Sequence, residues 1–278
     1  MTRGRWTIGC AALAASLLAS TAWAQGAKPL KKCAPDAVIA GTVCMDMYEA
    51  SVWRVPDPLG ANASLVKKIQ QGKATSDQLT AGGATRLGVA SGDYAPCADS
   101  GQNCTDDIYA VSLPGVTPSA SITWFQAQAA CENARKRLPS NAEWQAAVIG
   151  TPDPGPDNGT TDCNSTYQVG QDPTLTGSRG ACKSARGAYD MVGNLWEWVA
   201  DWVPYSTTCP SWGGFSNDDM CLSGASTTAN SPGALLRGGG FSFSVSEGSL
   251  AGPLAVNGDN GPSDADGLNF DFGFRCAR

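Results

Sequence analysis

The sequence predicts a loop-rich α+β domain cross-linked by disulfides. Its 278 residues include 33 glycines and 17 prolines but only 16% charged residues, a composition that suits one large domain with long loops. Two segments begin with helix capping boxes, and two others alternate apolar and polar residues as strands do. Residues 33–278 contain no repeat or linker that would divide them, so we expect a single domain.

The N-terminal residues are typical of a secretory signal peptide. Arg3 and Arg5 precede an apolar run over residues 8–18, and residues 22–24 have the small-residue pattern of a cleavage site. A lipoprotein anchor at Cys10 is the alternative, disfavoured because Thr7 occupies a position where an aliphatic residue is expected. Residues 1–24 are therefore expected to be removed and residues 25–32 to form a short polar lead. We expect an exported protein, periplasmic or secreted, with no membrane insertion.

Ten cysteines follow the predicted signal peptide, and an even number in an exported chain indicates a disulfide framework. Sequence alone does not fix the connectivity, but neighbours along the chain suggest four local bridges and leave one long-range pair. The suggested pairs are Cys33–Cys44, Cys97–Cys104, Cys163–Cys182, Cys209–Cys221 and Cys131–Cys276. A zinc site is disfavoured because the chain has no histidine and no CxxC pair.

The absence of histidine and the acidic balance exclude several function classes. A Ser-His-Asp or Cys-His nucleophile is impossible without histidine, and so is a histidine-ligated iron site. The formal net charge is −6, and loss of the two arginines of the signal peptide takes it to −8. No nucleic-acid or anionic-membrane partner is expected of such a chain.

Helices and strands can be placed in order along the chain. Thr123 to Gln126 form a capping box that starts a helix ending near Arg135, and Ser140 to Glu143 start another ending near Val148. The segment GTPDPGPDNG over residues 150–159 predicts a loop. Residues 241–246 and 268–274 alternate strictly and predict strands with one apolar face and one face of small polar residues.

Five segments of this chain resemble the formylglycine-generating enzyme family, also called the sulfatase-modifying-factor family. They are VCMDMYEASVW (Val43–Trp53), ITWFQAQAACENARKRLPSNAEW (Ile122–Trp144), GNLWEWVADW (Gly193–Trp202), LRGGGF (Leu236–Phe241) and GFRCAR (Gly273–Arg278). The first resembles the family's first strand, and the second its helix–KRLP–helix signature. The resemblance covers residues 44–278 and implies the formylglycine-generating-enzyme variant of the C-type-lectin-like fold.

The resemblance also implies a chemistry that this sequence lacks. Enzymes of the family bind copper through two cysteines after the RGG segment, and here those positions are Phe243 and approximately Gly248. Neither side chain can ligate Cu(I), which selects thiolates. We therefore expect a non-catalytic relative without copper. The alternative is an active copper-dependent oxidase that converts sulfatase cysteines to formylglycine.

The GNLWEWVADW segment admits three interpretations. Glu197 and Asp201 have the spacing of a carboxylate pair, but Trp196, Trp198 and Trp202 around them look like core residues, which disfavours a glycosidase site. The resemblance instead implies a structural Ca²⁺ held by Glu197 and nearby backbone carbonyls, with a second site beginning at an asparagine. The implied residues are Glu197, Val192, Gly193, Leu195 and, for the second site, Asn164. The third interpretation pairs Glu197 with a buried arginine such as Arg237.

The C-terminal segment from Ser242 to Gly273 has no lysine or arginine and is rich in small polar residues. It is similar to the variable region of retroelement-diversified proteins that use the same fold and end in GFR. This similarity implies a surface that binds a protein or glycan ligand of unknown identity. The expected ligand-binding residues are Ser242, Ser244, Ser246, Asn257, Asp259, Asn260, Asp264, Asp266, Asn269 and Asp271. A solvated loop without a partner, or a purely structural envelope protein, are the alternatives.

Overall fold

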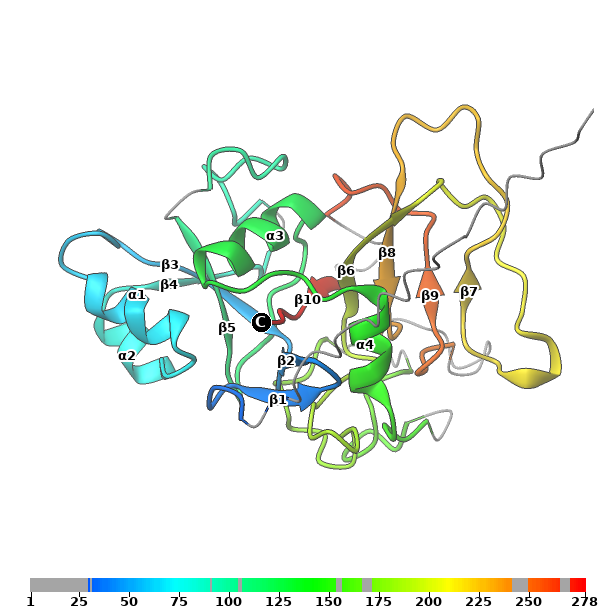
Figure 1. The fold of residues 1–278 in the computed structure, drawn as a ribbon, viewed down its shortest axis with the longest axis horizontal. Coiled ribbons are helices and arrows are strands. Elements are labelled where there is room, and N and C mark those ends of the chain that lie inside the picture. Colours follow the sequence, from blue (N-terminus) through cyan, green and yellow to red (C-terminus); the bar gives the residue numbers. More distant parts are fainter. Residues whose placement is uncertain are drawn as a thin grey trace, which may run out of the picture.

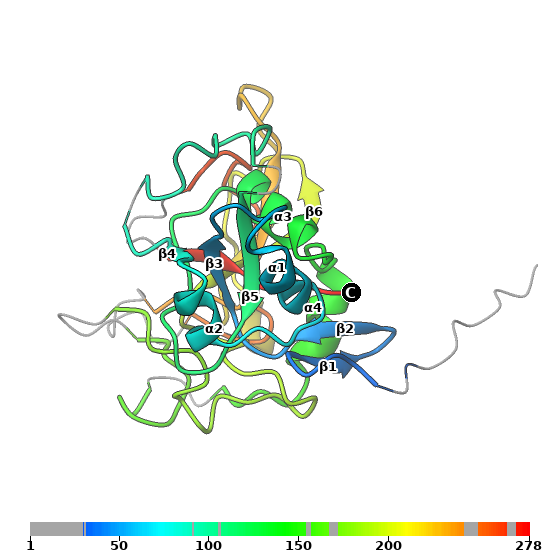
Figure 2. The same ribbon diagram turned by 90° about the vertical axis from the view of Figure 1, so that its left-hand side faces the viewer.

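We describe the fold from a computed structural model. The structure describes residues 30, 32–90, 92–104, 107–153, 157–166, 172–241, 250–265 and 271–278. Figure 1 and Figure 2 show a mixed α+β arrangement in which short helices cover small sheets and long loops connect them. No helix within these ranges is both long and apolar enough to cross a membrane.

The described strands form three sheets. The first is a hairpin of β1 (Ala37–Ala40) and β2 (Val43–Asp46). The second has the antiparallel order β4-β3-β5, with β3 at Ala50–Arg54, β4 at Thr85–Leu87 and β5 at Ile108–Ser112. The third has the order β10-β6-β8-β9-β7, and its strands run side by side in Figure 1. Its members are β6 (Trp196–Val203), β7 (Met220–Cys221), β8 (Gly233–Arg237), β9 (Val256–Asn257) and β10 (Phe272–Phe274).

The two helices predicted from capping boxes are confirmed. Helix α3 spans Trp124–Asn133, and Thr123 and Gln126 exchange side chain-to-backbone hydrogen bonds of 3.1 Å at its start. Helix α4 spans Asn141–Val148, where Ser140 and Glu143 make the same exchange at 3.3 and 2.8 Å. The sequence analysis did not place α1 (Ala63–Gln70), α2 (Ser76–Ala81) or the 3₁₀ turn η1 (Gly213–Phe215).

The strand predictions are met only in part. The segment Val43–Trp53 forms two strands, because β2 pairs with β1 whereas β3 turns away to pair with β4 and β5. Of the segment 268–274, residues 272–274 form β10. Of the segment 241–246, residues 242–246 lie outside the described ranges. The predicted loop at 150–159 belongs to a long connection, residues 149–195, that has neither helix nor strand where the structure describes it.

The core joins the helices to the sheets through aromatic residues and disulfides. Trp144 of α4, Trp198 of β6 and Phe274 of β10 are fully buried. All five predicted cysteine pairs are present as disulfides. The Cys131–Cys276 bridge connects α3 to the segment after β10 across 145 residues of sequence. A framework of this density is typical of proteins outside the reducing cytoplasm.

Trp202 was expected in the core, but its side chain lies at the surface. It is 45% exposed, whereas Trp196 and Trp198 on the same strand are buried as predicted. The register of the β6–β8 pairing shifts between Trp198 and Trp202, so the last part of β6 leaves the buried face that the first part follows. The side chain of Trp202 consequently lies at the surface.

Candidate functional site

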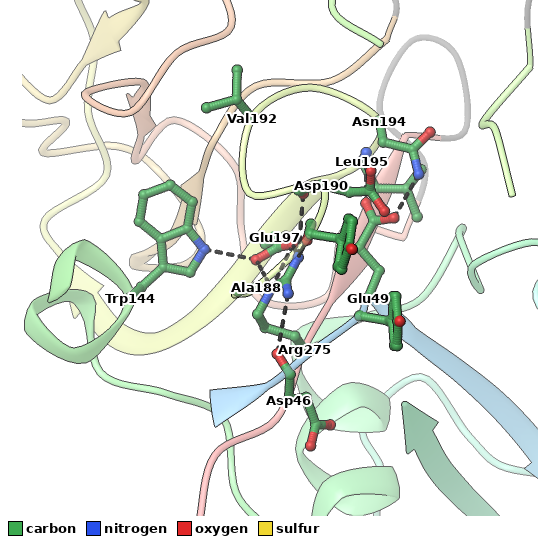
Figure 3. Close-up of polar contacts among 12 residues, drawn as sticks. Asp46, Glu49, Trp144, Ala188, Asp190, Val192, Asn194, Leu195, Glu197 and Arg275 are labelled. Carbon is green, nitrogen blue, oxygen red and sulfur yellow. Dashed lines mark hydrogen bonds and ion pairs between the residues drawn. The ribbon is translucent and has the colours of Figure 1, made fainter. Parts of the chain in front are cut away.

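The family-like motif GNLWEWVADW leads to a buried charged centre, shown in Figure 3. Glu197 of β6 faces Arg275, whose Nε lies 2.8 Å from both carboxylate oxygens and whose Nη2 lies 2.5 Å from Oε1. Trp144 of α4 donates its indole N–H to Oε2 of Glu197 at 2.6 Å. Each carboxylate oxygen of Glu197 therefore accepts hydrogen bonds from protein donors.

Strand pairing explains why these two residues meet. Strand β10 lies parallel to β6 with Gly273 opposite Glu197, which places Arg275 just beyond the paired region. A side chain at position 273 would displace Leu195, because its Cβ would lie 2.5 Å from Cδ1 of that residue. The GFR sequence thus supplies a close strand contact and then the cation that neutralises Glu197.

Arg275 also ties together segments that are distant in sequence. Its Nη1 donates to the carbonyl of Asp46 at 3.2 Å, and its Nη2 donates to the carbonyls of Tyr189 and Asp190 at 2.9 and 3.2 Å. The guanidinium therefore links β2, the loop before β6 and β6 itself. Arginine suits this position because its planar group offers five donors in a fixed geometry.

Two further carboxylates make the centre electrostatically unusual. Glu49 accepts from the backbone N–H of Leu195 at 3.0 Å and from the side chain of Asn194 at 2.5 Å. Burial raises the pKa of Glu49 well above its usual range and raises the pKa of Asp190 to about 7. Glu49, Asp190, Glu197 and Arg275 are each 2% exposed or less. Side chains so completely enclosed are not accessible to a substrate, so this centre has a structural role.

The calcium sites implied by the resemblance remain a prediction, and the described geometry does not fit them. Glu197, the expected charged ligand, is already neutralised by Arg275. Asn164, expected to begin the second site, has its Oδ1 3.5 Å from Nη2 of Arg179. A dication next to either guanidinium would meet a buried positive charge.

The interpretation that Glu197 pairs with a buried arginine is confirmed, but the arginine is Arg275, and the suggested Arg237 is wrong. The two residues lie opposite each other on β6 and β8, but the indole of Trp144 lies between their charged groups. The guanidinium of Arg237 stacks on this indole at 4.6 Å, and its Nη2 donates to the side chain of Gln145 and to the carbonyl of Pro253. Burial lowers the pKa of Arg237 to about 10, although the negative charge of Asp218 acts in the opposite direction.

The remaining expected catalytic groups have structural partners. Asp201 accepts the backbone N–H of Asn141 at 2.6 Å, at the start of α4, rather than facing Glu197. Cys276, the cysteine that follows the RGG segment in the sequence, is bonded to Cys131. Phe243 and Gly248 lie outside the described residues. Every cysteine that the structure describes is in a disulfide.

A cavity of 620 Å³ lies at the end of the RGG segment. Phe241 lines it, and the N–H of this residue donates to the carbonyl of Asn194 at 3.0 Å, which joins the cavity to the GNLWEW loop. The other lining residues include Gly88, Pro118, Ala120, Ser121 and Asp172. Most of this lining is apolar or uncharged, and Asp172 contributes a single exposed carboxylate. The sequence does not predict this cavity, because its walls come from segments that carry no recognisable motif.

The expected ligand-binding residues of the C-terminal segment divide into three groups. Ser242, Ser244, Ser246, Asp266 and Asn269 lie outside the described residues. A turn is formed by Asn257, Asp259 and Asn260, in which Oδ1 of Asn257 accepts hydrogen bonds from the backbone N–H of Asp259 at 3.0 Å and from the side chain of Asn260 at 2.9 Å. Asp264 is exposed, and its carboxylate accepts the N–H of Gly261. Asp271 is 4% exposed and lies beside Gly240, away from the surface.

The model of the family described as "Sulfatase-modifying factor enzyme 1-like domain" matches residues 97–278. A formylglycine-generating enzyme of Thermomonospora curvata is 31% identical over 102 residues, which cover 31% of this chain and 33% of that protein. A hercynine oxygenase of Mycolicibacterium smegmatis is 31% identical over 112 residues, 37% of this chain and 25% of the enzyme. The chain thus matches about a third or less of the length of these curated relatives.

Among solved structures, the P3c variant of a major tropism determinant is similar with a TM-score of 0.45 and 20% identity. The similar region covers 86% of this chain and 51% of that one. The variable protein 1 of Treponema denticola is similar over 58% of this chain and 70% of its own, with a TM-score of 0.37 and 19% identity.

Proposed function

We propose, from the premise that this chain belongs to the sulfatase-modifying factor enzyme 1-like domain family, that it is an exported, non-catalytic ligand-binding member of that family. One observation carries the non-catalytic part. The described cysteines, Cys276 included, are all held in disulfides, and the only other cysteine in the sequence is Cys10 of the predicted signal peptide. A disulfide sulfur is not a thiolate, and Cu(I) requires thiolates of the kind that the family's oxidases provide.

The chemistry of the other curated relative does not fit this chain either. The hercynine oxygenase matches the chain in sequence, but a histidine-ligated iron site requires a residue type that the chain does not contain. The buried centre around Arg275 supports the fold instead. Function is therefore best sought at a surface or in a cavity.

The binding surface that we favour includes the turn at Asn257 to Asn260, the exposed Asp264 and the cavity at Phe241. The internal hydrogen bonds of the turn hold its polar groups in place, and this preorganisation reduces the entropy cost of binding. The cavity has a volume within the range of small-ligand sites. Substitutions among related strains confined to residues 242–271 would support a changeable surface, and identical residues there would remove that support.

A direct assay separates this proposal from the alternative of an active copper oxidase. Purified protein is incubated with Cu(I), a thiol reductant, oxygen and a sulfatase peptide that contains the target cysteine. We expect the peptide to keep its mass, with a known formylglycine-generating enzyme as the positive control. A peptide that loses its thiol and gains formylglycine by mass spectrometry would refute the non-catalytic assignment.

A further inference from the structure

Three aromatic side chains gather at the surface between α3 and β6. The ring centroids of Trp124 and Trp202 are 5.0 Å apart, and those of Phe125 and Trp202 are 5.8 Å apart, both in edge-to-face geometry. Trp202 is 45% exposed, and the other two residues are partly exposed. We call these three residues the aromatic patch. Several other large apolar residues are exposed, but this patch concentrates three rings at one place.

The fold holds these rings in fixed positions. The indole N–H of Trp124 donates to the carbonyl of Val199 on β6 at 2.8 Å, and its backbone N–H donates to the carbonyl of Pro262 at 3.0 Å. Trp202 pairs in register with Ala234 of β8. The capping box at Thr123 fixes the first turn of α3, from which Trp124 and Phe125 project. The patch is therefore preorganised and loses little side-chain entropy on binding.

The patch adjoins the C-terminal segment of the proposed binding surface. Pro262 contacts the backbone of Trp124, and the carbonyl of Asn260 accepts the N–H of Ala234, the residue paired with Trp202, at 2.9 Å. Asp264 follows two residues after Pro262 and is exposed. Rigid aromatic rings thus lie beside hydrogen-bonding groups that are acidic or neutral.

We infer that the aromatic patch is a binding platform for the pyranose face of an uncharged glycan. This inference deepens the proposed binding function, on which it rests, by naming a ligand class and its anchor. The face of an aromatic ring carries partial negative charge and attracts the C–H groups on one side of a sugar ring. The exposed carboxylate of Asp264 can accept hydrogen bonds from hydroxyls, and the net charge of −6 disfavours an anionic glycan.

The size of the patch favours a sugar over a protein partner. A tryptophan side chain buries roughly 150–250 Å² in full, so the 45% exposure of Trp202 corresponds to about 100 Å². Three partly exposed rings then offer a few hundred Å² at most, whereas a stable protein interface buries about 800 Å² on each partner. One or two pyranose rings match an area of this size.

The test uses the purified mature protein and three uncharged hexasaccharides, those of β-1,4-linked N-acetylglucosamine, β-1,4-linked glucose and α-1,4-linked glucose. Binding is measured by isothermal titration calorimetry and by the change in tryptophan fluorescence. We expect at least one hexasaccharide to bind and Trp202→Ala to weaken this binding at least tenfold. Trp202→Phe keeps a ring and should retain part of the affinity.

The matched control is Phe215→Ala, which removes an aromatic side chain that is 79% exposed in η1 and outside the patch. It should bind as the unaltered protein does, and unchanged melting temperatures would show that every variant is folded. No binding of any hexasaccharide at millimolar concentration, or equal binding by Trp202→Ala, would overturn the inference. Formylglycine production in the oxidase assay would instead refute the proposed function, so the two failures are distinguishable.

Discussion

Substituting Glu197 by Gln tests the assignment of the buried centre most directly. Glutamine preserves the shape of the side chain and an acceptor for Trp144, but it removes the charge that neutralises Arg275. Loss of one partner from a buried ion pair costs about 3–5 kcal/mol, because the other charge is left uncompensated. Glu49 and Asp190 lie close enough to compensate in part, since the charge on Glu197 contributes to raising their pKa values. We therefore expect a loss near the lower limit, about 3 kcal/mol.

Urea unfolding followed by tryptophan fluorescence measures this loss, with the disulfides intact in every variant. At about 2–4 °C per kcal/mol for a domain of this size, the melting temperature should fall by roughly 6–12 °C. Arg137→Gln serves as the control, because it breaks the ion pair to Glu143 in which the arginine side chain is 44% exposed. Exposed pairs of this kind contribute less than about 1 kcal/mol.

The same experiment in EDTA distinguishes the arginine from a calcium ion. An ion bound only by the folded state stabilises that state by mass action, so chelation would lower the melting temperature of the unaltered protein to that of Glu197→Gln. If Arg275 is the partner, the gap between the two proteins persists in EDTA. A Glu197→Gln protein within about 1 kcal/mol of the unaltered one would refute the reasoning.

Two further predictions concern stability. Because burial raises the pKa of Asp190 to about 7, the folded state binds this proton more tightly than the unfolded state does, and the free energy of unfolding should fall as the pH rises from about 4 to 7. The melting temperature should therefore be higher at about pH 5 than at about pH 8, and Asp190→Asn should reduce that difference. A variant with the same pH profile as the unaltered protein would contradict the assignment. Replacing both cysteines of the Cys131–Cys276 disulfide by alanine should lower the free energy of unfolding by about 5 kcal/mol, and the same change at Cys97–Cys104 should lower it by about 2 kcal/mol. The difference arises because the two bridges span 145 and 7 residues of sequence. Equal losses in urea unfolding would contradict this chain-entropy account.

Local signals in the sequence predicted local structure well. Each capping box needs only four consecutive residues, so the starts of α3 and α4 at Thr123 and Ser140 could be read directly. The four local disulfides could be predicted for the same reason, because each joins cysteines that are neighbours in the sequence. The long-range pair then followed from the two cysteines that remained. The likeness of several motifs to one family gave the fold class, which the family match confirms.

Features that depend on the meeting of several distant segments could not be predicted from local sequence signals. Glu197 lies opposite Arg237 in the sheet, and only the insertion of Trp144 from α4 separates them and leaves Arg275 as the partner. The exposure of Trp202 likewise depends on a register shift within β6, which the alternation of residues does not reveal. The aromatic patch and the cavity at Phe241 were missed because their residues share no motif.

The central position of the segment after residue 271 has a consequence for how the chain folds during synthesis. Strand β10 forms one edge of the third sheet beside β6, and the backbone of Arg278 pairs with Cys44 at the opposite end of the described chain. The core cannot close until these late residues have left the ribosome, and contacts of such large sequence separation form slowly. For the exported protein that we propose, an export machinery that threads unfolded polypeptides would therefore receive the chain in an open state. Closure would follow in the compartment where its cysteines oxidise.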